Sequence, residues 1–280
     1  MKIAVVMSTY NSPESLRKAM LGYFAQQDPD FELLIADDGS NGRTADVLKE
    51  NCFSSLNLKH VWHADEGYRL SAIRNLAITK TDADYLIFTD GDVIPRKDFI
   101  SNHRRQARPS TFTSGCRINI PEHLHKHFTD ADILKNTIFS PEYFKNAALR
   151  IPMFRRWSLK LGWPGISIMN FFQWRHCVFY GSNTGVWRDD LVRANGFDEA
   201  WIGYGSEDRD IGFRLKNLGV KFRYLKHSFV QYHLAHPQPY RRVDEVSHNR
   251  SVMRSRKRSN IGWISTGIVK QKAAPHEGLV

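Results

Sequence analysis

Cysteine is scarce in this sequence, with three residues among 280 and no C-x-x-C pair. Cys52, Cys116 and Cys177 are far apart, so we expect neither a disulfide framework nor a structural zinc site, and we expect a reducing compartment. Long apolar runs are also lacking. The run Ile3–Met7 is too short for a signal peptide, and no run approaches the roughly 18 residues of a membrane-spanning helix. We therefore expect a cytoplasmic protein that does not cross a membrane.

Acidic residues are absent from two long stretches, 143–188 and 246–276, each of which holds seven Lys or Arg residues. The chain has 40 basic and 29 acidic residues and a net charge of +11, so without these fourteen cations it would hold 26 basic against 29 acidic residues. The positive charge is therefore local. The remaining composition, 41% apolar and 25% charged, is that of an ordinary globular protein able to bury a core.

Aromatic residues accompany the cations in both stretches. The first contains segment 154–157 (FRRW), and the second contains segment 254–258 (RSRKR) followed by Trp263. Such surfaces suit anionic membranes, and we expect a protein that is peripheral on the inner face of the cytoplasmic membrane. A solvated basic face explains the second stretch equally well. Nucleic-acid binding is disfavoured, because no zinc finger, RNA-recognition or helix-turn-helix signature accompanies the charge.

Strands and helices alternate through the first hundred residues, and Ser12 with Pro13 marks the start of the first helix. The expected strands are 3–9, 31–36, 58–63 and 85–89. This alternation predicts an α/β fold with a doubly wound, mainly parallel sheet flanked by helices, whose ligands bind at the carboxyl ends of the strands. In the less regular second half we expect strands within 111–118, 179–187 and 220–232 and a helix over 206–218.

The pattern Asp-x-Asp occurs five times, so the pattern alone identifies nothing. Asp90 and Asp92 differ from the others because they directly follow the buried strand 85–89. Two carboxylates at the rim of a sheet suit Mg²⁺ or Mn²⁺ bound to a diphosphate, whereas the plain alternative is a turn stabilised by an aspartate. Beside such a metal site His233, which follows a strand, becomes a candidate ligand.

Three further segments offer polar groups to a ligand. Asp37 and Asp38 end the second strand and can accept hydrogen bonds from a nucleobase or ribose, or can form an ordinary turn. Arg74 can pair with a phosphate or lie on the surface. Segment 203–210 (GYGSEDRD) places three carboxylates in the first turn of a helix that Ser206 can cap, and an ionised carboxylate there can take a proton from a hydroxyl group.

The order of these motifs is recognisable. Segments 8–11 (STYN), 37–40 (DDGS), 71–75 (SAIRN) and 90–92 (DGD) resemble the nucleotide-sugar half of family 2 glycosyltransferases with the GT-A fold. Segments 181–188 (GSNTGVWR), 195–199 (NGFDE) and 203–208 (GYGSED) are similar to the acceptor side of β-1,4-galactosyltransferases and bacterial chondroitin-polymerase-like enzymes. The resemblance covers residues 3–236, and it departs at Tyr204, where the relatives usually have tryptophan.

The resemblance implies an inverting transferase that moves a hexose or N-acetylhexosamine from a UDP-sugar to a saccharide acceptor with the help of Mn²⁺ or Mg²⁺. Residues 1–115 would form the nucleotide-sugar-binding half, 116–236 the acceptor-binding and catalytic half, and 237–280 a basic tail that associates with membranes. Together with the basic stretches, the resemblance favours one of two acceptors: a lipid-linked glycan, or a lipopolysaccharide or capsule precursor.

The resemblance also implies roles for individual residues. The residues that bind the UDP-sugar would be Thr9, Tyr10, Asn11, Asp37, Asp38, Arg74 and Asp90. Asp92 and His233 would hold the metal, with Asp90 on the ribose or the metal. Asp208 would be the catalytic base and Glu207 would orient a sugar. Inversion in one displacement needs a base opposite the leaving nucleotide and a Lewis acid on the diphosphate, which Asp208 and the metal would supply.

Two other functions are compatible with parts of the sequence. A sugar nucleotidyltransferase also uses a doubly wound sheet and acidic metal ligands, but it usually has a basic, glycine-rich phosphate loop where this chain has segment 8–11. A non-catalytic RNA- or membrane-binding module would explain the basic charge, but not acidic residues at every matched position.

Overall fold

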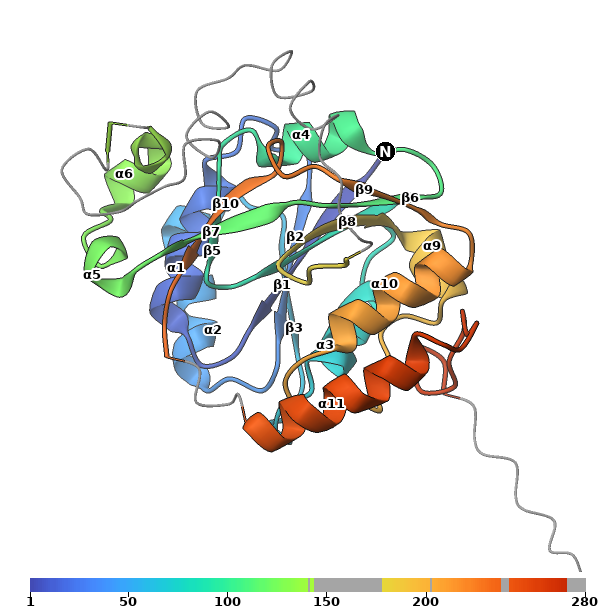
Figure 1. The fold of residues 1–280 in the computed structure, drawn as a ribbon. Coiled ribbons are helices and arrows are strands. Elements are labelled where there is room, and N and C mark those ends of the chain that lie inside the picture. The colour runs from blue at the N-terminus through green and yellow to red at the C-terminus, as the bar shows by residue number, and fades with distance from the viewer. Residues whose placement is uncertain (141, 144–177, 202, 238–241, 271–280) are drawn as a thin grey trace, which may run out of the picture.

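A seven-stranded sheet forms the centre of the computed structural model, which describes residues 1–140, 142–143, 178–201, 203–237 and 242–270 (Figure 1). Its strand order is β3-β2-β1-β4-β8-β6-β9, and β8 runs antiparallel to both neighbours while the other pairs are parallel. The strands are β1 (Ile3–Thr9), β2 (Glu32–Asp37), β3 (Leu58–Trp62), β4 (Tyr85–Asp90), β6 (Thr111–Ser114), β8 (Asn183–Trp187) and β9 (Lys221–Tyr224). The predicted α/β fold with a mainly parallel sheet is confirmed.

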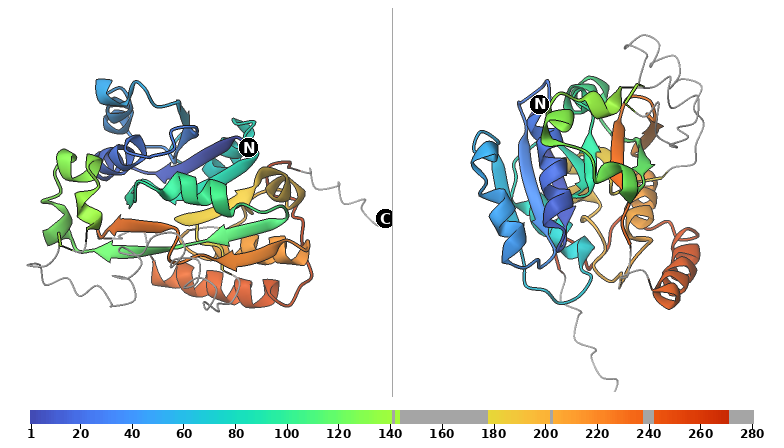
Figure 2. Two further views of the ribbon diagram at one scale, coloured as in Figure 1. Left: turned by 90° about the horizontal axis from the view of Figure 1, so that it is seen from above. Right: turned by 90° about the vertical axis from the view of Figure 1, so that its left-hand side faces the viewer.

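Helices cover both faces of this sheet, which is why its central strands are apolar throughout rather than alternating. In β1, Val5 faces one core and Val6 the other. The first core lies under α1 (Pro13–Phe24), α2 (Gly42–Leu48) and α4 (Phe99–Gln106). The second lies under α3 (Leu70–Thr79), α9 (Arg188–Arg193) and α10 (Glu207–Asn217). Figure 2 shows these two helical layers on opposite sides.

A second sheet has the order β5-β10-β7 and consists of β5 (Val93–Pro95), β10 (Val230–Leu234) and β7 (Cys116–Ile120). Two of the expected single strands, 111–118 and 220–232, are therefore each divided between the two sheets. Gly115 allows the first division, because a Cβ atom there would lie 2.6 Å from the side chains of Asn183 and Phe229. The division brings β10 alongside β5, directly after Asp92. The shorter elements are η1 (Asn51–Phe53), α5 (Glu122–His125), α6 (Asp130–Leu134) and η2 (Thr137–Phe139).

Ser12 and Ser206 occupy the predicted N-cap positions, but neither side chain caps its helix. Helix α1 does begin at Pro13, but the Ser12 side chain makes no capping hydrogen bond. Ser206 precedes α10 with φ +85°, and its side chain makes no capping bond either. Gly203 and Gly205, in the loop before Ser206, also have positive φ, so the loop turns sharply before the helix begins.

Within the predicted basic tail 237–280, residues 243–270 contain a helix and pack against the body. Helix α11 (Val243–Arg256) lies beside α10 in both views of Figure 2. Arg256 donates to Asp198 at 2.6 Å and lies 3.3 Å from a carboxylate oxygen of Asp210. Residues 271–280 and most of the first basic stretch, 144–177, lie outside the described residues.

Within the described ranges, no helix has both the length and the apolar character needed to span a membrane.

Asn195 holds the end of this C-terminal segment. Its amide donates to the carbonyl oxygens of Ile264 at 2.7 Å and Val269 at 2.8 Å, and its side-chain oxygen accepts from the Val269 amide at 2.8 Å. Its φ of +59° lies in the left-handed region, where asparagine is tolerated better than alanine.

We expect Asn195→Ala to lower the free energy of unfolding by about 2–3 kcal/mol, because three partly buried hydrogen bonds are lost and the backbone is strained. Urea denaturation measures this difference. Asn260→Ala, at an exposed position in the same segment, should change it by less than about 0.5 kcal/mol. Equal losses in the two variants would show that Asn195 does not anchor the segment.

Candidate active site

A cleft of about 980 Å³ opens at the carboxyl ends of β1 and β4, beside the second sheet. Most of the predicted site residues line it: Thr9, Tyr10, Asn11, Asp38, Arg74, Asp90, Asp92, Glu207, Asp208 and His233. Asp37 does not. The cleft therefore collects residues from both halves of the chain, as expected for ligands that bind at the carboxyl end of a parallel sheet.

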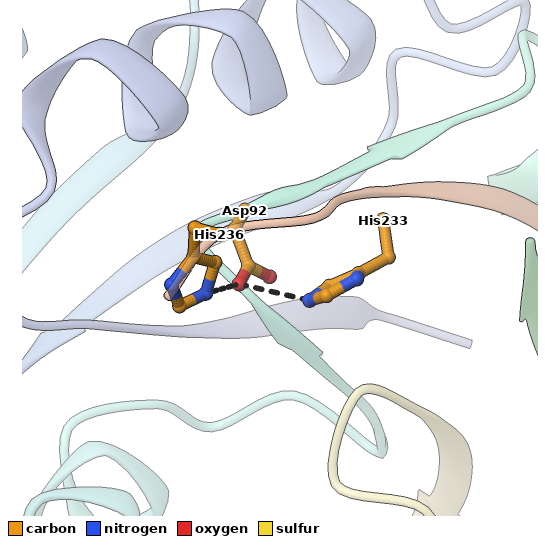
Figure 3. A group of neighbouring side chains, drawn as sticks. All are labelled: Asp92, His233 and His236. Carbon is orange, nitrogen blue, oxygen red and sulfur yellow. Dashed lines mark hydrogen bonds and ion pairs between the residues drawn. The ribbon is translucent and has the colours of Figure 1, made fainter. Parts of the chain in front are cut away.

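Asp92 and two histidines form a compact group at one end of the cleft (Figure 3). A carboxylate oxygen of Asp92 lies 3.2 Å from Nε2 of His233 and 2.8 Å from Nε2 of His236. One ligand atom from each residue lies within 4.8 Å of the other two. The sequence analysis identified Asp92 and His233 but missed His236, although it is only three residues beyond His233 and lies just after the same strand.

This group fits a divalent metal ion. The second carboxylate oxygen of Asp92 and Nδ1 of His233 are buried and have no hydrogen-bond partner within the described part of the chain. A carboxylate with two imidazoles suits Mn²⁺ better than Mg²⁺, which prefers oxygen ligands. Asp90 lies outside this group, and its expected contact with the ribose or the metal stays a prediction. Its carboxylate instead lies 3.4 Å from Arg74 and 3.4 Å from Arg117.

The pKa values of the two aspartates in segment 90–92 are shifted in opposite directions. Burial alone would raise the pKa of Asp92, but hydrogen bonds from His233 and His236 outweigh it and hold that pKa well below its usual range. Burial and the neighbouring charge of Asp92 instead raise the pKa of Asp90 to about 6. Asp92 thus stays ionised well into the acidic range, whereas Asp90 takes up a proton as the pH falls through about 6.

Arg74 lies at the centre of the site, fully buried. Its guanidinium donates to Asp208 at 2.8 Å, lies 3.4 Å from Asp90, and donates to the Ser8 hydroxyl at 3.1 Å. The next residue of α3, Asn75, fixes this position because it donates to the carbonyl oxygen of Phe197 and accepts from its amide, both at 2.8 Å. Arg74 therefore binds two carboxylates of the protein itself.

Asp208 has both carboxylate oxygens in defined bonds. One accepts from Arg74 and the other accepts from the Gly181 amide at 2.8 Å. Any side chain at position 181 would collide with Arg74 and Asp208, so this close approach requires glycine. The Asp208 side chain is 28% exposed and lines the cleft, so a ligand hydroxyl can reach it.

Glu207 precedes Asp208 in the first turn of α10 and also lines the cleft, but it is much more buried. Its carboxyl group is buried, and one of its oxygens has no partner among the residues described. Burial, followed by the charge of Asp208, raises the pKa of Glu207 to about 8. The sequence analysis expected the helix N-terminus to keep these acids ionised, and for Glu207 burial reverses that expectation. Tyr68 and Tyr204 line the cleft as an edge-to-face pair, with ring centroids 6.1 Å apart.

Asp38 and the end of β1 form another part of the cleft lining. Asp38 accepts from Nε2 of His63 at 2.6 Å and from the Arg69 amide at 3.0 Å. Tyr10 presents a half-exposed ring and donates its hydroxyl to Asp65 at 2.8 Å. His63 has no local signal in the sequence, because it meets Asp38 only through the pairing of β2 with β3.

Asp37 and Asn11 stabilise the loop around this end. Asp37 accepts from the Ser40 amide at 2.8 Å and pairs with His60 at 2.9 Å, so its side chain points away from the cleft. Asn11, with φ +44°, accepts from the Asn41 amide at 3.0 Å. Of the two adjacent aspartates, only Asp38 is presented to a ligand.

Comparisons with known proteins agree with this arrangement. Residues 4–150 match glycosyl transferase family 2, and residues 170–237 match a family described as the N-terminal domain of galactosyltransferase. The first match covers more than half of the chain, and the chain belongs to glycosyl transferase family 2. This membership favours sugar transfer over the nucleotidyltransferase and the non-catalytic module.

Several curated proteins are similar in sequence. The uncharacterized glycosyltransferase YfnE of Bacillus subtilis (strain 168) is 27% identical over 90% of this chain and 70% of its own length. Chondroitin synthase of Escherichia coli is 27% identical over 88% of this chain and 36% of its own length. Validoxylamine A glucosyltransferase of Streptomyces hygroscopicus subsp. limoneus is 29% identical, with 81% and 50% covered. The chain thus spans between 36% and 70% of the length of these relatives.

Solved structures share the fold. Staphylococcus aureus TarS 1–349 in complex with UDP-GlcNAc has a TM-score of 0.56 at 15% identity, over 86% of this chain and 60% of that one. The mannosyltransferase PcManGT from Pyrobaculum calidifontis in complex with GDP-Man and Mn²⁺ has a TM-score of 0.57 at 16% identity, with 85% and 58% covered. The predicted GT-A fold is confirmed by this likeness.

The raised pKa of Glu207 predicts how stability depends on pH. A buried carboxyl with a pKa of about 8, against an ordinary 4.5, binds its proton more tightly in the folded state. Its contribution to stability is therefore lost as the pH rises from about 5 to 8.

We expect Glu207→Gln to remove this loss and to gain at least 1–2 kcal/mol relative to the unchanged protein between pH 5 and 8, since one pKa unit corresponds to about 1.4 kcal/mol. Urea denaturation across this pH range measures the difference. Glu122→Gln, at an exposed site, should leave the pH profile unchanged. Parallel profiles for Glu207→Gln and the unchanged protein would contradict a buried, protonated Glu207.

Proposed function

We propose that this protein is an inverting, metal-dependent glycosyltransferase that moves a hexose or N-acetylhexosamine from a UDP-sugar to a saccharide acceptor. The observation that carries the proposal is the meeting, in one cleft, of the Asp92–His233–His236 group with Asp208. A displacement at an anomeric carbon needs charge stabilisation on the leaving diphosphate and a base for the attacking hydroxyl. The same cleft therefore offers residues for both tasks.

Each residue then has one task in the reaction. Asp92, His233 and His236 would hold the metal, which when bound neutralises negative charge on the departing diphosphate. Asp208 would take the proton of the acceptor hydroxyl. At the same time the hydroxyl oxygen would bond to the anomeric carbon, and the bond between that carbon and the diphosphate would break. Arg74 and the Gly181 amide hold the Asp208 carboxylate in one orientation.

The other residues of the cleft would position the two substrates. Asp38, fixed by His63, would accept a hydrogen bond from the uracil, and the exposed ring of Tyr10 would pack against the nucleotide. Thr9 and Asn11 lie beside them. Glu207, protonated near neutral pH, would donate a hydrogen bond to a sugar oxygen.

The acceptor and the cellular setting are also part of the proposal. A lipid-linked glycan or a lipopolysaccharide or capsule precursor would account for the local positive charge. Such an acceptor would place the protein at the inner face of the cytoplasmic membrane. Chondroitin synthase, by its name, makes a polysaccharide, and its similarity to this chain supports a growing glycan as acceptor.

Asp208→Asn tests the base. We expect UDP release from a UDP-sugar in the presence of acceptor to fall by about 10²–10⁴-fold, which is the usual contribution of a general base, while the dissociation constant of the UDP-sugar changes less than about threefold. Asp189→Asn, in the exposed first turn of α9, is the matched control and should keep full activity. Undiminished turnover in Asp208→Asn would remove Asp208 from this role. A panel of UDP-sugars identifies the donor.

His236→Ala tests the metal site, including the ligand that sequence reasoning missed. We expect Asp92→Ala and His236→Ala each to weaken Mn²⁺ binding at least about tenfold in calorimetric titrations with UDP present, because each removes one of three ligands. The exposed His127→Ala is the control and should bind as before. If His236→Ala binds Mn²⁺ normally, the three-residue metal site is wrong.

A further inference from the structure

Helices α10 and α11 present a continuous row of cations on their outer side. It consists of the exposed residues Arg209, Lys216, Arg250, Arg254, Lys257 and Arg258, which we call the basic surface. We propose that the basic surface docks the protein onto a membrane that contains anionic phospholipid. This inference names the surface of contact and goes beyond sugar transfer, whose residues lie in the cleft.

The cations of α11 share one face of the helix. Arg250, Arg254, Lys257 and Arg258 follow the spacing i, i+4, i+7 and i+8, which places them on a single stripe. The buried residues of α11, Asn249 and Met253, lie on the side that packs against the body. The stripe is therefore exposed along the second half of α11 and the turn that follows it.

The structure adds two cations that belong to neither basic stretch of the sequence. Arg209 and Lys216 are exposed on α10, on the same face as Phe213. The ammonium group of Lys257 lies 5.1 Å from the centre of the Phe213 ring, which joins the exposed faces of the two helices. Only folding brings these six cations together.

Little acidic charge opposes the basic surface. None of its six cations has an ion-pair partner within the part of the chain that the structure describes. Nearby, Asp210 is buried and paired with Arg214, and Glu245 packs against the backbone at Gly203. Asp244 is the acid that stays exposed at the start of α11. The charge is thus available to an external anionic partner.

Exposed apolar side chains near the C-terminal ends of the two helices favour a membrane over other polyanions. Ile261 and Trp263 are 40% and 42% exposed. The Asn217 amide donates to the carbonyl oxygen of Ile261 at 2.9 Å, which fixes this segment at the end of α10. Cations beside an exposed tryptophan suit the interface of a bilayer, where the ring enters the headgroup layer and the cations contact phosphates.

Docking on this surface would bring the cleft close to the membrane. The carboxylates of Glu207 and Asp208 lie in the first turn of α10, and Asn249 of α11 donates to the carbonyl oxygen of Tyr204 in the loop before it. The start of α10 therefore lines the cleft, and the middle of α11 lies against the loop that borders it. An acceptor carried by a lipid would reach Asp208 along this side of the molecule.

Vesicle flotation with the full chain tests the proposal. We expect binding to vesicles of phosphatidylcholine that contain about one third phosphatidylglycerol, and little binding to phosphatidylcholine alone. Each cation near an anionic surface contributes roughly fivefold to partitioning. The α11 variant combines four substitutions: Arg250→Gln, Arg254→Gln, Lys257→Gln and Arg258→Gln. It should therefore bind at least about tenfold more weakly than the unchanged protein. Ile261→Ala with Trp263→Ala should weaken binding as well.

Matched controls separate this surface from net charge and exposed apolar area. Removing four exposed cations elsewhere should change binding less than about threefold: Arg43→Gln, Lys80→Gln, Lys97→Gln and Lys135→Gln. Phe24→Ala with Leu134→Ala, which are as exposed as the Ile261 and Trp263 pair, should also have little effect.

Three results would overturn the proposal. They are absence of binding to the anionic vesicles, equal binding by the two fourfold variants, and preferential binding of a short RNA that is lost in the α11 variant. UDP-sugar turnover without vesicles should be the same in the α11 variant and the unchanged protein. The docking surface and the proposed chemistry can thus fail independently of each other.

Discussion

The buried ion pair between Arg74 and Asp208 is the interaction on which the site depends, because it connects the two halves of the chain. Arg74 comes from α3 and Asp208 from α10, and the guanidinium has no access to water. A buried guanidinium is tolerated only when carboxylates and further hydrogen bonds replace its hydration, which Asp208, Asp90 and Ser8 do here. Since Asn75 holds α3 against the backbone at Phe197, the pair forms with one geometry. Loss of either partner would leave a charge uncompensated in the floor of the cleft.

The site also depends on the second sheet, which brings β10, the strand that carries His233, to the end of β4. Asp92 lies between β4 and β5, and β5 pairs with β10, so His233 is opposite Val93 in the register of the strands. This pairing exists because the chain leaves the main sheet at Gly115, and again between β9 and β10, instead of continuing as two long strands. The Asp92–His233–His236 group thus depends on strand pairing between residues about 140 positions apart.

Sequence reasoning identified the parts of the site that carry local signals and missed those that depend on distant contacts. Asp90 and Asp92 follow an apolar strand, and Glu207 and Asp208 begin a helix, so their positions could be predicted. His63 and His236 were not assigned in this way, because each acquires its role from an aspartate that is distant in sequence and follows another strand. The packing of α11 was missed for the same reason, since Arg256 looks like part of a solvated basic run until Asp198 is placed beside it. Local propensity describes elements, whereas the register of strands and the pairing of charges need the whole fold.

The adjacent acids Glu207 and Asp208 show most directly how position decides chemistry. Both lie in the first turn of α10, where the helix dipole favours the ionised form of each. A step of one residue turns a side chain by about 100° around the helix. Both side chains line the cleft, but Glu207 is buried in its wall while Asp208 pairs with Arg74 and is more exposed. For Glu207, burial then outweighs the effect of the helix dipole, so this carboxyl group stays protonated near neutral pH. The same turn of helix therefore offers a carboxyl group that can donate a hydrogen bond beside a carboxylate that can accept a proton. Two carboxyl groups exposed at the surface would not differ in this way. In the proposed mechanism, the difference would let one helix end bind one sugar hydroxyl and activate another.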